Sequence, residues 1–303
     1  MIETTQPRPD GFPAEGTLLT DIDGLFLAAR QTASGTLTGL HRSTRRGTSI
    51  EFSEHKLYTP GDDIKHIDWR AFAKTDKLHV KQFEDETNLR VELLIDHSGS
   101  MGFQGAQPLS KLDYAKVITA SLAYLALRQS DATGLATFST TISEQLPPRS
   151  KSSHLMEILN RLTALEASGE TNLSATLEQF VRSRRRPTFT IVVTDLLDPS
   201  DTVMQMLRAL TSRRHEVTVL QLLAPEEIDF PYENPAVFSS MEDARKLFVH
   251  PRTLRQRYVK AMAEHLEERK KQMQAAQIDY KLIRTDVAPR EAIADLIKTR
   301  MGK

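Results

Sequence analysis

Short apolar segments that alternate with longer amphipathic segments constrain the fold of this chain more than any other feature. The apolar segments lie at residues 91–96, 132–139, 188–195, 216–223 and 278–286. Between most of them, apolar residues recur at helical spacing over ten residues or more. Strands that alternate with helices of this length predict an α/β, doubly wound fold with a mainly parallel sheet. The segment 141–148 ends in a proline pair and is expected to be an antiparallel edge strand.

The pattern of the chain changes near residue 89. Residues 1–88 contain one helical segment, at about 16–33, and then extended pieces such as 49–52 and 79–83 between turn-forming residues. We therefore expect a small, partly β N-terminal module over 1–88 and the doubly wound domain over 89–303. Within that domain, residues 237–251 predict a hairpin and 251–276 a long charged helix, together an insertion at about 236–276.

Composition excludes several kinds of site and partner. The 303 residues include no cysteine, which excludes a disulfide framework, a zinc–thiolate site and a thiol nucleophile. The 40 basic and 40 acidic residues cancel, so no overall charge attracts nucleic acid or anionic lipid. No segment approaches the roughly 18 consecutive apolar residues of a membrane span. The acidic, proline-rich start does not resemble a signal peptide, and we expect a cytoplasmic protein.

Side chains with hard oxygen atoms stand where two of the expected strands end. Asp96, Ser98 and Ser100 follow one strand at alternate positions, so their side chains can point toward one place. His97, at the intervening position, should point the other way, toward the rim or the sheet. Asp195 ends the segment 188–195. With a strand order of 3-2-1-4-5-6, these two strands are neighbours at the edge where open α/β sheets bind ligands.

A threonine adds a further oxygen to this group. Thr171 lies in a loop directly before an expected helix. Oxygen ligands that include two carboxylates suit a hard cation, Mg²⁺ or Mn²⁺. The predicted metal site consists of Asp96, Ser98, Ser100, Thr171 and Asp195. The competing interpretation is that the aspartates cap helices and the serines form turns.

These five residues resemble the metal-ion-dependent adhesion site of the von Willebrand factor A domain, which is Asp-x-Ser-x-Ser, a loop threonine and a strand-end aspartate. The resemblance implies a Rossmann-like A-type domain. It also implies a bound Mg²⁺ or Mn²⁺ whose coordination shell is completed by an acidic side chain of a partner protein. On this basis we expect a binding module and no enzymatic activity.

A second resemblance covers nearly the whole chain. The stretch 58–70, followed by a strand at 80–86, resembles a bacterial domain-of-unknown-function family, number 58, in which this segment precedes an A-type domain. Longer members of that family carry transmembrane helices ahead of the segment, whereas no such helix is expected here. The resemblance implies association with MoxR-type AAA+ ATPases.

The sequence also suggests two other functions, of which the first uses the same residues. A hydrolase of phosphoesters could use the divalent ion as a Lewis acid. Against it, the position two residues after Asp96, where an aspartyl phosphatase has a second aspartate, holds Ser98. Ser98 also lacks the Gly-x-Ser-x-Gly turn of a serine hydrolase. A weaker alternative is a structural scaffold whose partner surface is the 251–276 helix.

A second group of potential ligands lies upstream. It consists of Asp62, Asp63, His66 and Asp68. Because Pro60 and Gly61 strongly favour a turn, we interpret this group as a turn that precedes a buried Trp69 rather than as a metal site.

Overall fold

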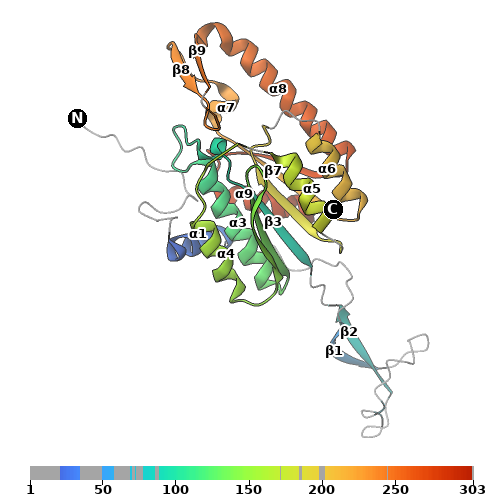
Figure 1. The fold of residues 1–303 in the computed structure, drawn as a ribbon. Helices are drawn as coiled ribbons and strands as arrows, with labels where there is room; N and C mark the ends of the chain where they lie inside the picture. The colour runs from blue at the N-terminus through green and yellow to red at the C-terminus, as the bar shows by residue number, and fades with distance from the viewer. Residues whose placement is uncertain are drawn as a thin grey trace. The chain divides into compact units, whose positions relative to one another are not determined.

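The computed structural model describes residues 21–34, 50–57, 69, 72, 78–85, 89–170, 172–183, 186–197, 202–243 and 245–301. The chain divides into two compact units (Figure 1). The smaller unit lies within 42–89 and contains β1 (Ile50–Leu57) and β2 (His79–Asp85), which pair antiparallel. The register of this pair shifts between Phe52 and Glu54.

Trp69 corrects one expectation about the smaller unit. The sequence predicts that this side chain is buried, but it is 61% exposed. Its ring contacts Phe72 edge-on, with 6.3 Å between the ring centroids, and that contact leaves most of the indole in solvent. The proposed alternative ligands Asp62, Asp63, His66 and Asp68 lie outside the described residues.

The larger unit is built on a six-stranded sheet. In chain order its strands are β3 (Arg90–Asp96), β4 (Ala132–Phe138), β5 (Ile142–Arg149), β6 (Phe189–Thr194), β7 (Glu216–Leu223) and β10 (Asp279–Arg284). In space they follow the order β10-β7-β6-β3-β4-β5. All neighbours are parallel except β5, which pairs antiparallel with β4 at the edge. Both the predicted 3-2-1-4-5-6 order and the predicted edge strand are confirmed.

Helices cover both faces of this sheet (Figure 1). One face carries α3 (Lys111–Arg128), α4 (His154–Thr163) and α9 (Pro289–Met301). The other carries α5 (Leu173–Ser183) and α6 (Thr202–Ser212), which bury an apolar cluster with the strands and with Met273. This arrangement is the α/β doubly wound fold that the alternating segments predict.

Helix α1 (Ile22–Ser34) belongs to the larger unit. This corrects the expectation that the helix forms one N-terminal module with the rest of 1–88. The helix packs on α3, α4 and α9 and buries Leu25, Ala28, Ala29 and Ala33. This packing explains why α3, with 18 residues, is buried at all but three positions: the sheet covers one side of it and α1 another. A helix that is buried nearly all round needs such a second layer.

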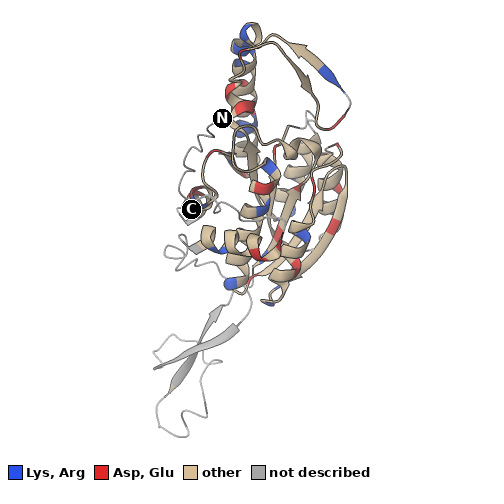
Figure 2. Cartoon of the chain, turned by 90° about the vertical axis from the view of Figure 1, so that its left-hand side faces the viewer, with Lys and Arg blue, Asp and Glu red and all other residues tan. Residues whose placement is uncertain are grey.

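The connection from β7 to β10 is long. It contains α7 (Pro225–Asp229), the hairpin β8 (Ala236–Ser239) and β9 (Lys246–Val249), and α8 (Pro251–Ala275). The hairpin and α8 lie where the sequence places a hairpin and a long helix, whereas α7 was not predicted. Figure 2 shows charged residues of both signs along α8. Among the described helices, none has the length and apolar character needed to cross a bilayer.

Two leucines of α1 test its packing. Leu25→Ala should lower the free energy of unfolding by about 2–5 kcal/mol, because it leaves a cavity between α1 and its neighbours. Leu27→Ala, at a side chain that is 46% exposed, should change it by less than about 0.5 kcal/mol. Urea unfolding of both variants measures the difference. Equal effects would show that α1 does not pack as described.

Candidate functional site

Asp96 and Asp195 lie at the carboxyl ends of adjacent parallel strands. Strands β3 and β6 are paired as far as Ile95 and Val193, so the residues that follow stand side by side. Both aspartates are buried, with 0% and 1% exposure. The hydroxyl of Thr194 donates a hydrogen bond to Oδ2 of Asp96 at 2.6 Å. The sheet therefore brings together the two carboxylates that the sequence places at strand ends.

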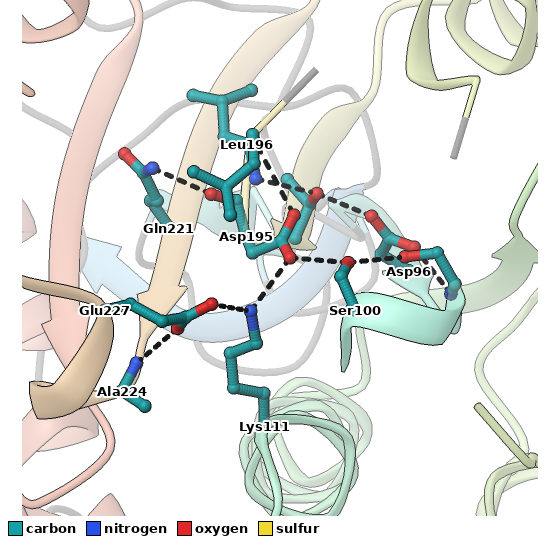
Figure 3. A network of polar contacts seen from close by, with 11 residues as sticks. Asp96, Ser100, Lys111, Asp195, Leu196, Gln221, Ala224 and Glu227 are labelled. Atoms are coloured by element: carbon teal, nitrogen blue, oxygen red, sulfur yellow. Dashed lines mark hydrogen bonds and ion pairs between the residues drawn. The ribbon is translucent and has the colours of Figure 1, made fainter. Parts of the chain in front are cut away.

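The turn after Asp96 brings in Ser98 and Ser100, and Figure 3 shows Ser100 beside Asp195. The backbone N–H of Ser98 donates to Oδ1 of Asp96 at 2.9 Å, which folds the turn back on the carboxylate. The hydroxyls of Ser98 and Ser100 are 3.2 Å apart, and that of Ser100 donates to Oδ2 of Asp195 at 2.7 Å. Four of the five predicted ligands thus form one continuous set of contacts.

The fifth predicted ligand, Thr171, lies outside the described residues. The chain on either side of it is described and adjoins the site. The carbonyl of Gly169 accepts a hydrogen bond from Gly99 N–H at 2.9 Å, and Asn172 N–H donates to Ser139 O at 2.9 Å. His97 turns away as predicted, because its ring contacts Glu166 O at 3.2 Å and Ser143 Oγ at 2.8 Å.

Gly99, between the two serines, is in close contact with the distant β8–β9 hairpin. A Cβ atom at Gly99 would lie 2.1 Å from the carbonyl oxygen of Met241, at the tip of that hairpin. Real Cβ atoms do not approach backbone oxygens so closely, so glycine is required here while the tip keeps its place. The predicted insertion is thus packed directly against the predicted site.

Sequence reasoning missed a buried lysine at the site. Lys111, the first residue of α3, is 0% exposed and donates to Asp195 Oδ2 at 2.9 Å and to Glu227 Oε1 at 2.6 Å. Lysine is ordinarily a surface residue, and its position beside the Ser110 cap gives no sign of burial. The signal for Glu227 was present, because it closely follows the end of β7, next to β6 in the sheet. Glu227 Oε2 also accepts from Ala224 N–H at 2.7 Å.

The backbone of Asp195 is held from the neighbouring strands. Gln221 of β7 donates to the Asp195 carbonyl at 2.7 Å, and Tyr280 of β10 donates in turn to Gln221 at 2.5 Å. The next residue, Leu196, has a φ of 52°, a left-handed conformation that is strained for leucine. The polar contacts around Asp195 compensate for this strain and fix the direction of its carboxylate.

The electrostatics of the site favour a bound cation. Burial and, next, the negative charge of Asp195 raise the pKa of Asp96 to about 7. Burial alone would lower the pKa of Lys111, but Asp195 and Glu227 outweigh it and raise that pKa above its usual value. The lysine is therefore held as a cation between two carboxylates, while Asp96 has no basic side chain among the groups that shift its pKa.

The oxygens of the site lie close to one another. The separations of 3.2 Å between the serine hydroxyls and 2.7 Å between Ser100 and Asp195 are hydrogen-bond distances. Neighbouring oxygens around an octahedral Mg²⁺, with bonds of about 2.1 Å, would have a similar spacing of about 3.0 Å. In the part of the chain that the structure describes, no three His, Asp or Glu side chains gather closely enough to hold one metal ion. The serine hydroxyls would therefore have to act as ligands.

A cleft adjoins these residues. It has a volume of about 460 Å³ and is lined by Ser100 and Asp195 on one side and by residues of α7, the hairpin and α8 on the other. The site is therefore reachable from solvent although both aspartates are buried.

A family model described as "Protein of unknown function DUF58" matches residues 54–268. The chain belongs to this DUF58 family. Two relatives are the uncharacterized proteins Mb1516 of Mycobacterium bovis and Rv1480 of Mycobacterium tuberculosis. Each is 26% identical over 279 residues, which cover 90% of this chain and 86% of the relative.

Similar solved structures include BatB from Bacteroides thetaiotaomicron, with a TM-score of 0.46 and 19% identity over 71% of this chain and 100% of that one. Another is an aerotolerance-related membrane protein from Bacteroides fragilis, with a TM-score of 0.45 and 19% identity over 70% of this chain and 99% of that one. Likeness at this level carries no argument about the activity of the DUF58 chain.

Replacing Lys111 tests the buried ion pairs. Lys111→Met should lower the free energy of unfolding in EDTA by about 3–5 kcal/mol, because the buried carboxylate of Asp195 and the partly buried carboxylate of Glu227 lose their cation. Adding Glu227→Gln to this variant should restore part of the loss, since it removes one of those charges. Urea unfolding at pH 7 measures both. A loss under about 1 kcal/mol for Lys111→Met would contradict the described network.

Proposed function

We propose that this protein is a non-enzymatic adaptor that binds a partner protein through one Mg²⁺ or Mn²⁺. The ion would be held by Asp96, Ser98, Ser100 and Asp195, with Thr171 as the predicted fifth ligand. The observation that carries the proposal is the continuous set of oxygen contacts at two adjoining strand ends, open to a cleft.

The charge of the site supports a divalent ion. When ionised, Asp96, Asp195 and Glu227 carry three negative charges, and Lys111 supplies one positive charge among them. Three minus one leaves two negative charges in a buried place, where uncompensated charge is costly. An ion of charge +2 matches this excess.

When bound, such an ion would offer a remaining coordination position to an oxygen of the partner. The residues around it have separate tasks. Thr194 and the Ser98 N–H orient Asp96, while Lys111 orients Asp195. Ser98 and Ser100 contribute neutral oxygens, so the site still attracts an incoming carboxylate.

The position of His97 removes one candidate for the base of a hydrolase. Such a base stands near the attacking oxygen and is most often a histidine, and His97 is the histidine adjacent to the site in sequence. Its two ring nitrogens are both engaged away from the carboxylates, by Glu166 O and Ser143 Oγ.

The family resemblance implies a MoxR-type AAA+ ATPase as the partner, and we propose that this partner presents the acidic side chain.

A pull-down from extract of the source cells, read by mass spectrometry, tests the proposal. Wild type in Mg²⁺ should recover a MoxR-type ATPase, and recovery should fall at least about tenfold in EDTA or with Asp96→Ala, because the bridging ion is lost. Asp23→Ala, an exposed aspartate of α1, is the control and should bind as wild type does. Equal recovery in every lane, or no ATPase in any lane, would refute the proposal.

A further inference from the structure

The β8–β9 hairpin and the first turn of α8 expose large apolar side chains. Val237 and Phe248 are cross-strand partners and are 58% and 60% exposed. Leu247 of β9 is 65% exposed, and Leu254 of α8 is 39% exposed. Single exposed apolar residues are common on proteins, but a group of them on adjoining elements indicates a surface that another molecule covers. We call these four residues the outer surface.

The outer surface is separate from the contacts that build the predicted metal site. The tip of the hairpin lies at that site, because the Met241 carbonyl packs on Gly99. The other end of the hairpin leads into α8, where the ring of Phe248 meets that of His250 edge-on at 5.0 Å. Figure 1 shows this end of the hairpin and the start of α8 standing clear of the sheet.

Positive charge borders the outer surface. Residues 244–263 include six arginines and lysines but no aspartate or glutamate, whereas the whole chain has 40 charges of each sign. The six are Arg245, Lys246, Arg252, Arg255, Arg257 and Lys260. Figure 2 shows the start of α8 in blue, with acidic residues only further along the helix. The apolar side chains and the cations thus belong to the same part of the molecule.

Half of these cations have no acidic partner. Three of the six form ion pairs with carboxylates. Within the described part of the chain, no carboxylate pairs with the other three, which are Lys246, Arg255 and Arg257. These three side chains are exposed and able to contact an external anion.

The arginines at the start of α8 do not serve the stability of the helix. Arg252 and Arg255 lie in its first two turns, and its first turn has no acidic residue. Positive side chains at a helix N-terminus oppose the helix dipole and reduce stability. A contact with an external anion would offset that cost.

An apolar surface bordered by unpaired cations matches the surface of an anionic bilayer. The bilayer interface takes up apolar side chains, and its negative headgroups attract arginine and lysine. A nucleic acid would pair with the cations but would leave Val237, Leu247 and Phe248 in water. A second copy of this chain would bring like charges together across a two-fold interface.

We propose that the outer surface docks on a membrane that contains anionic lipids. Val237, Leu247 and Phe248 enter the boundary between headgroups and acyl chains, while Arg255 and Arg257 contact the headgroup phosphates. Successive residues of a strand point to opposite faces, so Leu247 and Phe248 expose apolar groups on both faces of the hairpin. A fluid apolar layer can surround both faces, whereas a flat protein partner covers one. The inference does not depend on the metal-dependent function.

Flotation of the full chain with lipid vesicles tests the inference. In EDTA, which removes divalent ions that could bridge protein and headgroups, the protein should float with vesicles that contain about 30% phosphatidylglycerol in phosphatidylcholine. The bound fraction should fall at least about fivefold with phosphatidylcholine alone, and likewise at high salt, because both conditions remove the attraction between cations and headgroups.

Two matched pairs of variants locate the contact. The double variant Arg255→Gln with Arg257→Gln should weaken binding to the anionic vesicles at least about tenfold. Lys270→Gln with Lys271→Gln removes the same charge from exposed positions of the same helix and should leave binding within about twofold.

The second pair tests the apolar side chains. Phe248→Ser should weaken binding about fivefold or more, because the serine no longer enters the bilayer interface. Met156→Ser, at a side chain of α4 that is 43% exposed, should bind as wild type does.

A fluorescent label reports whether the hairpin enters the bilayer. Because the chain has no cysteine, Phe248→Cys can be labelled with an environment-sensitive fluorophore at one position. Its emission should increase and shift to shorter wavelength on anionic vesicles, since the interface excludes water. The same label on Met156→Cys should not change.

The opposite results would overturn the inference. They are no flotation with anionic vesicles, equal losses in the two charge variants, or an unchanged label at position 248. Binding of a duplex DNA oligonucleotide without flotation would assign the cations to nucleic acid instead. A dimer that Phe248→Ser dissociates, again without flotation, would assign the surface to a second copy of the chain. All these measurements are made in EDTA, so none of them decides the metal-dependent function.

Discussion

The repulsion between the buried carboxylates of Asp96 and Asp195 is the constraint on which the rest of this structure depends. Two parallel strands end side by side and place both groups out of water, where like charges are costly. Hydrogen-bond donors from the surrounding residues reduce that cost. The Thr194 hydroxyl and the Ser98 N–H donate to Asp96, and Ser100 and Lys111 donate to Asp195. A divalent cation would neutralise the negative charge that these donors leave uncompensated.

The arrangement of the surrounding helices and of the hairpin places these donors at the two carboxylates. Lys111 reaches Asp195 because the Ser110 cap begins α3 beneath the strand ends, where Asp113 N–H donates to Ser110 Oγ at 3.0 Å. Because α3 is apolar around most of its surface, α1 must cover it, and the N-terminal helix becomes part of the larger unit. On the opposite rim, β7 leads into α7 with Glu227, and the hairpin that follows returns to Gly99. The predicted insertion thus shapes the entrance to the site.

Periodicity and strand-end rules predicted the sheet, its order and the meeting of Asp96, Ser98, Ser100 and Asp195, because these depend on local pattern and on the geometry of parallel strands. They failed where tertiary contacts decide. Lys111 looks like a solvated lysine until the carboxylates that surround it are known, and α1 cannot be assigned to a unit from its own amphipathic pattern. The exposure of Trp69 and the reach of the hairpin tip depend likewise on contacts far apart in the sequence. Thr171 stays a prediction.

Titration of the purified protein with Mn²⁺, followed by electron paramagnetic resonance of the free ion, tests the central claim most directly. The account predicts one Mn²⁺ bound per chain, displaced by excess Mg²⁺. Binding should be lost in Asp96→Asn, which removes the negative charge of one ligand, and weakened at least about tenfold in Ser100→Ala, which removes an oxygen ligand. Asp23→Asn should bind as wild type does. No bound Mn²⁺ in wild type, or equal binding by Asp96→Asn, would contradict the account.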